Sequence, residues 1–170
     1  MKKLYFILIF VFMSSTAFAE QGQIKQTGFF SGTSKVIGDD KGNFSIIYEG
    51  TIGNKAIEGT TFGDRSSSYC VGSIVGLKGK GFETGVCINK FEDGSTTTTH
   101  YEGVMGKILR WKFVSGTGKY ENISGGGTTS YAQIDSAKDG VVQSYNQIVG
   151  TYNLNSVSYT HLTLPTICSV

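Results

Sequence analysis

Few residues in this sequence combine the type and the spacing that catalysis requires. Histidine occurs only at His100 and His161, so a histidine-based metal centre or a histidine-activated nucleophile would have few possible partners. Acidic residues are adjacent only at Asp39–Asp40 and Glu92–Asp93, both beside glycine. Such pairs are typical of solvated turns. The sequence therefore predicts no metal site, and it leaves the catalytic residues, if any, unknown.

A glycine-rich run from Gly116 to Gly127 resembles a nucleotide-binding loop only in part. The dinucleotide pattern beginning at Gly116 would need glycine at position 121, which is Glu121, and Lys119 is followed by Tyr rather than Ser or Thr. These glycines are instead typical of turns and bulges at the rim of a barrel, where a positive φ or a missing side chain is needed. No cofactor is predicted.

Aromatic residues provide the main candidate for a binding site. Tyr69, Phe82, Tyr101 and Trp111 are predicted to share one face of a sheet and to bind a small apolar or aromatic ligand. The phenol hydroxyls and the indole N–H could each orient such a ligand. The same rings could instead fill the interior of a small barrel completely. Both interpretations depend on the strands that carry the rings.

Short alternating segments bounded by Gly, Asn and Asp run through the chain. This pattern is typical of a many-stranded sandwich or barrel. Strands are predicted at 28–34, 43–51, 128–135 and 141–154, around a central group of four between residues 69 and 113. About eight strands with short connections can close, which removes exposed edges. The predicted fold class is all-β, a small closed antiparallel barrel of about eight strands, similar to the calycin and lipocalin barrels.

The first central hairpin sets a register that fixes both faces of its strands. A two-residue turn at Lys78–Gly79 pairs Tyr69 with Ile88 on a mainly apolar face, and Cys70 with Cys87 on the other face. A register shifted by one residue would mix the two faces. The apolar face is predicted to be the inner one.

The next two turns extend this face. Asp93–Gly94 is a favoured two-residue hairpin turn, and it would place Val86 opposite Tyr101. A three-residue loop at 105–107 would then place Tyr101 opposite Trp111. The four aromatic residues named above would all face inward, with Met105 and Phe113. The outer face is predicted to collect Glu83, Asn89, Thr98, His100, Glu102, Arg110 and Lys112.

The same register predicts a disulfide between Cys70 and Cys87. Directly opposed residues on neighbouring antiparallel strands have Cα atoms about 4.5 to 5.5 Å apart, which suits a disulfide. An exported protein is exposed to an oxidising environment that maintains such bonds.

Both ends of the sequence differ from the barrel domain predicted at 20–156. Lys2 and Lys3, an apolar run and Ala17-Phe18-Ala19 predict a signal peptide at 1–19, and hence a periplasmic or secreted protein. Val157 to Leu162 matches the translation of a transposon mosaic-end adapter, so 157–170 is expected to be read-through and not native. Beyond the signal peptide, 13 basic residues balance 13 acidic ones, so no nucleic-acid partner is predicted.

The glycine-rich segment 116–127, with its Gly-Thr-Gly-Lys-Tyr start and second glycine cluster, resembles the allene oxide cyclase-like and dirigent-like barrel proteins. The strand at 85–87 and the Asp93–Gly94 turn are also similar, and matching segments cover roughly residues 66–152. The resemblance implies the barrel fold. The group includes plant cyclases that fold an unstable epoxide into a cyclopentenone, dirigent-type proteins that steer radical coupling, and bacterial members of unassigned role. No cyclase-site residue carries over.

Three functions are compatible with these observations. The barrel could bind a small apolar or aromatic ligand, or it could be an enzyme of the isomerase or cyclase kind. A cavity carboxylate paired with Tyr or Asn would favour the enzyme, whereas a purely apolar cavity would favour binding. In the third interpretation the apolar face meets lipid, as in small outer-membrane barrels.

Overall fold

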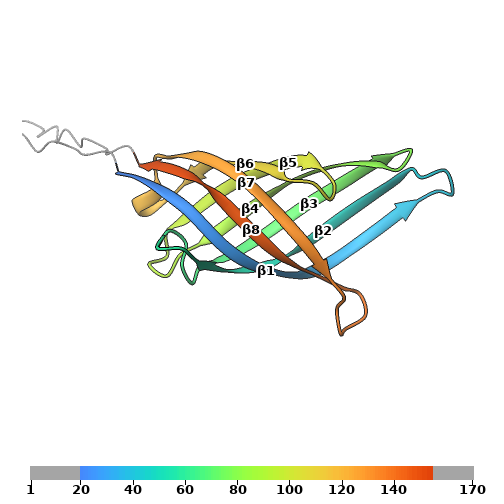
Figure 1. The fold of residues 1–170 in the computed structure, drawn as a ribbon, viewed down its shortest axis with the longest axis horizontal. Helices are drawn as coiled ribbons and strands as arrows, with labels where there is room; N and C mark the ends of the chain where they lie inside the picture. Colours follow the sequence, from blue (N-terminus) through green and yellow to red (C-terminus); the bar gives the residue numbers. More distant parts are fainter. Residues whose placement is uncertain (1–19, 155–170) are drawn as a thin grey trace, which may run out of the picture.

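The computed structural model describes residues 20–154, which form one closed antiparallel barrel of eight strands (Figure 1). The predicted fold class is therefore confirmed. The predicted signal peptide and the predicted non-native tail lie outside the described residues. The elements, in chain order, are β1 (Glu20–Gly38), β2 (Phe44–Ala56), β3 (Ser67–Leu77), β4 (Lys80–Lys90), β5 (Thr96–Val104), β6 (Leu109–Gly116), the short 3-10 helix η1 (Gly118–Tyr120), β7 (Ile123–Ile134) and β8 (Val141–Leu154).

Strand β1 closes the barrel because it pairs along its length with two neighbours. Gly28 lies opposite Asn54 of β2 and also opposite Asn146 of β8. Every strand therefore has two partners, and the barrel has no free edge. The described residues contain no helix that is long and apolar enough to cross a membrane.

The β3–β4 hairpin has the predicted register. Lys78 and Gly79 have φ angles of 52° and 76°, as a type I′ turn requires at both central positions. Tyr69 lies opposite Ile88, and Cys70 lies opposite Cys87.

The β4–β5 hairpin differs by one residue from the prediction. The Gly94 N–H donates to the Phe91 carbonyl at 3.0 Å, and the Phe91 N–H donates to the Ser95 carbonyl at 3.0 Å. With Gly94 at φ 82°, this is a three-residue loop in which glycine takes the left-handed position, not a two-residue turn. Val86 therefore lies opposite His100 rather than Tyr101.

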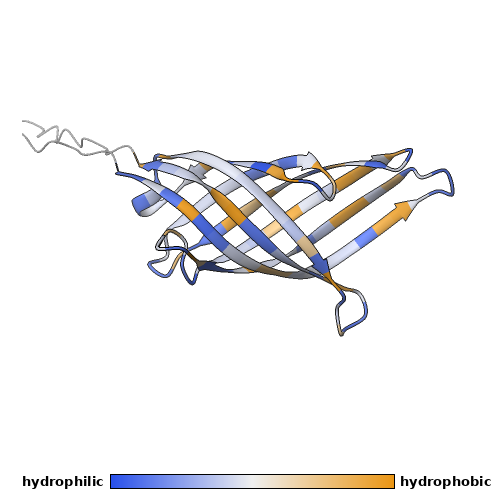
Figure 2. Cartoon of the chain, in the orientation of Figure 1, coloured by the Kyte–Doolittle hydropathy of each residue, from blue (hydrophilic) through white to orange (hydrophobic). Residues whose placement is uncertain are grey.

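This shift reverses the faces of β3 and β4 relative to β5 and β6, because side chains alternate along a strand. The β5–β6 register is as predicted, with Tyr101 opposite Trp111. Both of these residues face inward, together with the two cysteines. Hydrophobic and hydrophilic residues are interspersed along the strands (Figure 2). The apolar side chains of β3 and β4 that were predicted inside are instead 42–52 % exposed on the outer face: Tyr69, Val71, Val75, Phe82, Val86 and Ile88.

Aromatic side chains close the end of the barrel near Glu20 and Leu154. Phe62, in the loop between β2 and β3, has its ring centroid 4.7 Å from that of Tyr152 and 5.4 Å from that of Tyr120. The Phe62 carbonyl accepts a hydrogen bond from Gln26 Nε2 at 2.6 Å, which anchors the loop. We call this cluster the aromatic plug; its members are Phe62, Phe91, Phe113, Tyr120 and Tyr152.

Candidate functional site

A cavity of about 670 Å³ occupies the interior of the barrel. It extends from the aromatic plug to the opposite end, where Ser34 and Val36 of β1 line it and are exposed. We call this second end the open end. The volume falls within the range of about 300 to 1,000 Å³ that is usual for small-molecule sites. The barrel is therefore not completely filled by its own side chains.

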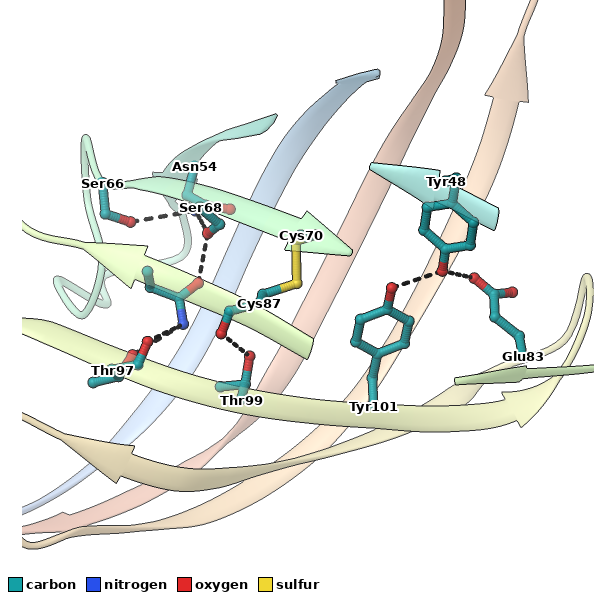
Figure 3. Close-up of a disulfide and its surroundings, with 11 residues drawn as sticks. Tyr48, Asn54, Ser66, Ser68, Cys70, Glu83, Cys87, Thr97, Thr99 and Tyr101 are labelled. Carbon is teal, nitrogen blue, oxygen red and sulfur yellow. Dashed lines mark hydrogen bonds between the residues drawn. A yellow bond between two sulfur atoms is a disulfide. The ribbon is translucent and has the colours of Figure 1, made fainter. Parts of the chain in front are cut away.

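Glu83 of β4 places a carboxylate inside this cavity, and its residue is only 5 % exposed. Oε1 accepts a hydrogen bond from the Tyr48 hydroxyl at 2.6 Å, and Oε2 accepts one from the Tyr131 hydroxyl at 2.9 Å. The Tyr101 hydroxyl lies 2.6 Å from that of Tyr48 (Figure 3). We call Glu83, Tyr48, Tyr101 and Tyr131 the carboxylate cluster.

The direction of the hydrogen bonds follows from the number of protons. Tyr48 has a single hydroxyl proton, and a carboxylate is a stronger acceptor than a phenol. Because Tyr48 donates that proton to Glu83, Tyr101 donates its own to the Tyr48 oxygen. The lone pairs of Tyr101 and the second lone pair of each Glu83 oxygen remain for a ligand.

Two glycines on the inner face make room for this cluster. Gly72 of β3 and Gly85 of β4 lie opposite each other. A Cβ atom on either residue would overlap the hydroxyl of Tyr101, and a Cβ on Gly72 would also lie 2.5 Å from the hydroxyl of Tyr48. The two tyrosine side chains therefore reach Glu83 only because both positions lack a side chain.

Burial is the main cause of the altered acidity of the cluster phenols. It raises the pKa of Tyr101 and the pKa of Tyr131, each to about 12. It also raises the pKa of Tyr48, and the neighbouring Tyr101 and Glu83 add to that effect. The cavity lining, which lies wholly within residues 20–154, includes no Lys, Arg or His. No cation of the cavity wall therefore balances Glu83.

The middle of the cavity is mainly apolar. The predicted Cys70–Cys87 disulfide is confirmed, and both cysteines are buried. Ile24, Leu109 and Trp111 belong to the same hydrophobic cluster. The disulfide separates the carboxylate cluster from a second polar group (Figure 3).

This second polar group, which we call the polar floor, lies near the aromatic plug. Asn54 Nδ2 donates to the Ser68 hydroxyl at 2.8 Å and to the Ser66 hydroxyl at 3.3 Å. The Ser68 hydroxyl donates to Asn89 Oδ1 at 2.5 Å, and Asn89 Nδ2 donates to the Thr97 hydroxyl at 2.9 Å. The cavity thus has a polar group on each side of an apolar middle.

The structure separates the four aromatic residues that were predicted to bind a ligand together. Tyr101 and Trp111 line the cavity. Tyr69 and Phe82 are 47 % and 50 % exposed on the outer surface, so their predicted place on the inner face was wrong. The cause is the reversed face of β3 and β4 described above. The Trp111 indole N–H donates to the Thr128 carbonyl at 3.1 Å, so it is already engaged.

Among the residues predicted on the outer face, some face outward and others face inward. His100 faces outward as predicted, and its Nε2 lies 3.0 Å from the Thr84 hydroxyl. Within residues 20–154 no group of His, Cys, Asp or Glu side chains could hold a metal ion. Glu83 and Asn89 were predicted outside and instead face inward, for the same reason as Tyr69 and Phe82.

The carboxylate cluster was not predicted from the sequence, for a physical reason. The more apolar face of β3 and β4 was predicted to be the inner one, whereas the true inner face carries Cys70, Gly72, Glu83, Gly85 and Cys87. The opposed Gly72 and Gly85 could have indicated the inner face, since small residues inside a narrow barrel leave room for large side chains from other strands. Tyr48 was not singled out, although it lies in a predicted strand.

Comparisons with known proteins support the fold. No family model matches the sequence, and no curated protein matches it. Among solved structures, the chain is similar to a pterocarpan synthase dirigent protein, with a TM-score of 0.53 and 10 % sequence identity. The match covers 88 % of this chain and 100 % of that chain. This similarity shows the fold alone, which is the barrel that the predicted resemblance implies.

Proposed function

We propose that the barrel binds a small, mainly apolar molecule that carries a hydroxyl or amine group. The ligand enters through the open end and donates a hydrogen bond to Glu83. Tyr101 and Trp111 pack against its apolar part. This proposal keeps two of the four aromatic residues first predicted as ligand contacts.

The observation that carries the proposal is a carboxylate buried in an open cavity whose lining supplies no cation. Burying a charge is costly unless hydrogen bonds or an opposite charge compensate. The hydroxyls of Tyr48 and Tyr131 compensate part of this cost. A hydrogen-bond donor on the ligand would supply the remaining compensation. Glu83 lies in the cavity wall, where a ligand can reach it.

Two measurements test this proposal. Native mass spectrometry of the protein purified from its exported compartment should detect a retained small molecule. Trp111 is the only tryptophan, so its fluorescence should respond to a panel of terpenoid alcohols, phenols and aromatic amines. Fatty acids, whose carboxylate cannot donate to Glu83, should give no response. No retained molecule and no fluorescence change across the panel would overturn the proposal.

A second candidate function is acid–base catalysis, in an isomerase or cyclase of the allene oxide cyclase-like kind. The hydrogen-bonded series from Tyr101 through Tyr48 to Glu83 favours it, because a carboxylate held in place by phenol donors can accept a proton from a substrate. The similar dirigent protein is named a pterocarpan synthase, which is compatible with chemistry in such a barrel.

Catalysis and binding make different predictions for the same variant. An isomerase or cyclase converts its ligand into a product of equal mass, which liquid chromatography separates. Under catalysis, Glu83→Gln should abolish this conversion, and at least one converted compound should still bind. If every bound compound is recovered unchanged from the wild-type protein, catalysis is excluded for those compounds.

The outer surface favours a barrel that does not lie in a membrane. A lipid-facing barrel needs an apolar band around its whole circumference. Exposed apolar side chains are most frequent on β3 and β4 and also occur on β1, β2 and β8, but this band is interrupted on β5 and β6, where His100, Glu102, Arg110 and Lys112 face outward. The disulfide is compatible with an oxidising compartment. Recovery in the membrane fraction, with heat-dependent mobility in a gel, would contradict this inference.

A further inference from the structure

Two amide groups of the cavity wall flank the same glycine. Asn54 of β2 and Asn146 of β8 each lie opposite Gly28 of β1, one on either side. Asn54 is 7 % exposed, and both residues line the cavity. Within residues 20–154, neither Asn54 Oδ1 nor Asn146 Nδ2 has a hydrogen-bond partner, although both atoms are buried. One is an acceptor and the other is a donor.

The free acceptor of Asn54 points across the glycine. A Cβ atom placed on Gly28 would lie 3.0 Å from Asn54 Oδ1, so this oxygen lies above β1, on the side toward Asn146. Neighbouring strands are about 4.8 Å apart, which places the two asparagine Cα atoms roughly 10 Å apart. One small polar group fits between two side chains at that spacing. A hydroxyl can accept from Asn146 Nδ2 and donate to Asn54 Oδ1 at the same time.

We propose that Asn54 and Asn146 bind a ligand hydroxyl, and that the cavity takes an elongated ligand with a polar group at each end. The inference rests on the proposed function, which assigns the other end to Glu83. The second hydroxyl site narrows the class of ligand. The ligand is an apolar chain or ring system with a hydroxyl at its inner end and a second hydrogen-bond donor at its outer end.

The length of the cavity fits such a ligand. Tyr48 of the carboxylate cluster and Asn54 both lie on β2, six residues apart. At about 3.3 Å per residue they are separated by about 20 Å along the strand. A strand tilt of about 40° reduces this to about 15 Å along the barrel axis. An extended ten-carbon diol has roughly this length, and the apolar middle of the cavity suits its methylene groups.

The test compares decanediol, with a hydroxyl at each end, with decanol, using Trp111 fluorescence. The wild-type protein should bind the diol about five- to tenfold more tightly, the value of one or two additional neutral hydrogen bonds. This exceeds the twofold statistical advantage of two equivalent ends. Asn146→Leu should abolish the preference, and so should Asn146→Ala, which removes the donor without filling space. Gln147→Leu, at an exposed neighbouring position, is the matched control.

The outcomes separate this inference from the proposed function. We call the proposed hydroxyl site at Asn54 and Asn146 the second anchor. If both compounds bind equally to the wild type and Glu83→Gln weakens the binding of both, the second anchor is wrong and the proposed function stands. A diol preference that survives in both Asn146 variants would also overturn the second anchor. Failure of both compounds to bind the wild-type protein would count against the proposed function itself. Thermal unfolding of each variant shows that the comparison is made on folded protein.

Discussion

Glu83 combines burial, two phenol donors and a position in the wall of the cavity. Glu83→Gln keeps the shape of the side chain and removes its charge. We expect the affinity for a hydroxylated or amine ligand to fall about tenfold or more, because hydrogen bonds to a charged group contribute about 1.5 to 3 kcal/mol. Titration by fluorescence or calorimetry measures this change.

Glu102→Gln is the control for this prediction, because Glu102 is exposed on the outer face of β5. It should leave ligand affinity unchanged. The thermal stability of Glu83→Gln should be close to that of the wild type, since the change also removes the cost of burying a charge. Equal ligand affinity in wild type and Glu83→Gln would show that the carboxylate does not contact the ligand.

The disulfide gives a second prediction about single residues. Cys70 and Cys87 are 17 residues apart and lie in the middle of the cavity wall. Replacing both with Ser should lower the free energy of unfolding by about 3 kcal/mol, the value for a loop of about this length. Urea unfolding measures the loss. Peptide mapping of unreduced protein should find neither thiol open to alkylation; two alkylated thiols at these positions would contradict the prediction.

Among the elements, the loop between β2 and β3 closes one end of the cavity through Phe62. Its ring packs against four other aromatic rings of the plug. Phe62→Ala should remove this packing and lower the free energy of unfolding by about 3 kcal/mol. It should also speed ligand exchange, because solvent then reaches the polar floor. Stopped-flow fluorescence measures the exchange rate, and Phe82→Ala on the outer face is the control.

The β4–β5 loop shows how much of the fold the sequence could predict. Alternation, turn residues and hairpin registers were sufficient for an eight-stranded barrel, for the β3–β4 register and for the disulfide. Asp93–Gly94 is a turn signal in both two-residue and three-residue loops. The choice of loop depends on backbone hydrogen bonds between Phe91 and Ser95. Because the β4–β5 register differs by one residue from the predicted one, Glu83 was predicted on the outer face.

The rest of the site depends on contacts between strands that are distant in sequence. Tyr48 and Glu83 are 35 residues apart, and Tyr131 is 48 residues beyond Glu83. Local sequence patterns do not indicate which residues so far apart in the sequence come into contact. Closure of β8 onto β1 likewise brings Asn146 and Asn54 to either side of Gly28. The candidate site is therefore a product of closure, whereas the strands themselves follow from local sequence.

For the whole molecule, one end of the barrel is plugged by aromatic rings and the other is open. The carboxylate cluster is nearer the open end, since Tyr48 and Glu83 lie close to the ends of β2 and β4 that form it. The polar floor lies behind the disulfide. A ligand that enters through the open end therefore reaches Glu83 before it reaches the amides of the polar floor.

The buried phenols of the carboxylate cluster predict how the stability of the protein changes at alkaline pH. Burial raises the pKa of Tyr101 and of Tyr131 from an ordinary value of 10.0 to about 12. Between these values the unfolded chain loses phenol protons that the folded protein retains. The free energy of unfolding should therefore be unaffected by these groups below about pH 10 and should fall as the pH rises from about 10 to about 12.

Urea unfolding at a series of pH values, with tyrosinate absorbance recorded in parallel, checks this prediction. Tyr101→Phe should make the loss of stability with pH shallower, because one of the groups that cause it is removed. Tyr145→Phe, on the exposed outer face of β8, is the matched control. The slope for each variant is compared with that of the wild type, so a general destabilisation does not imitate the effect. If Tyr101→Phe and Tyr145→Phe have the same slope, the cluster phenols are not shielded from solvent. The buried hydrogen-bonded arrangement around Glu83 would then be incorrect.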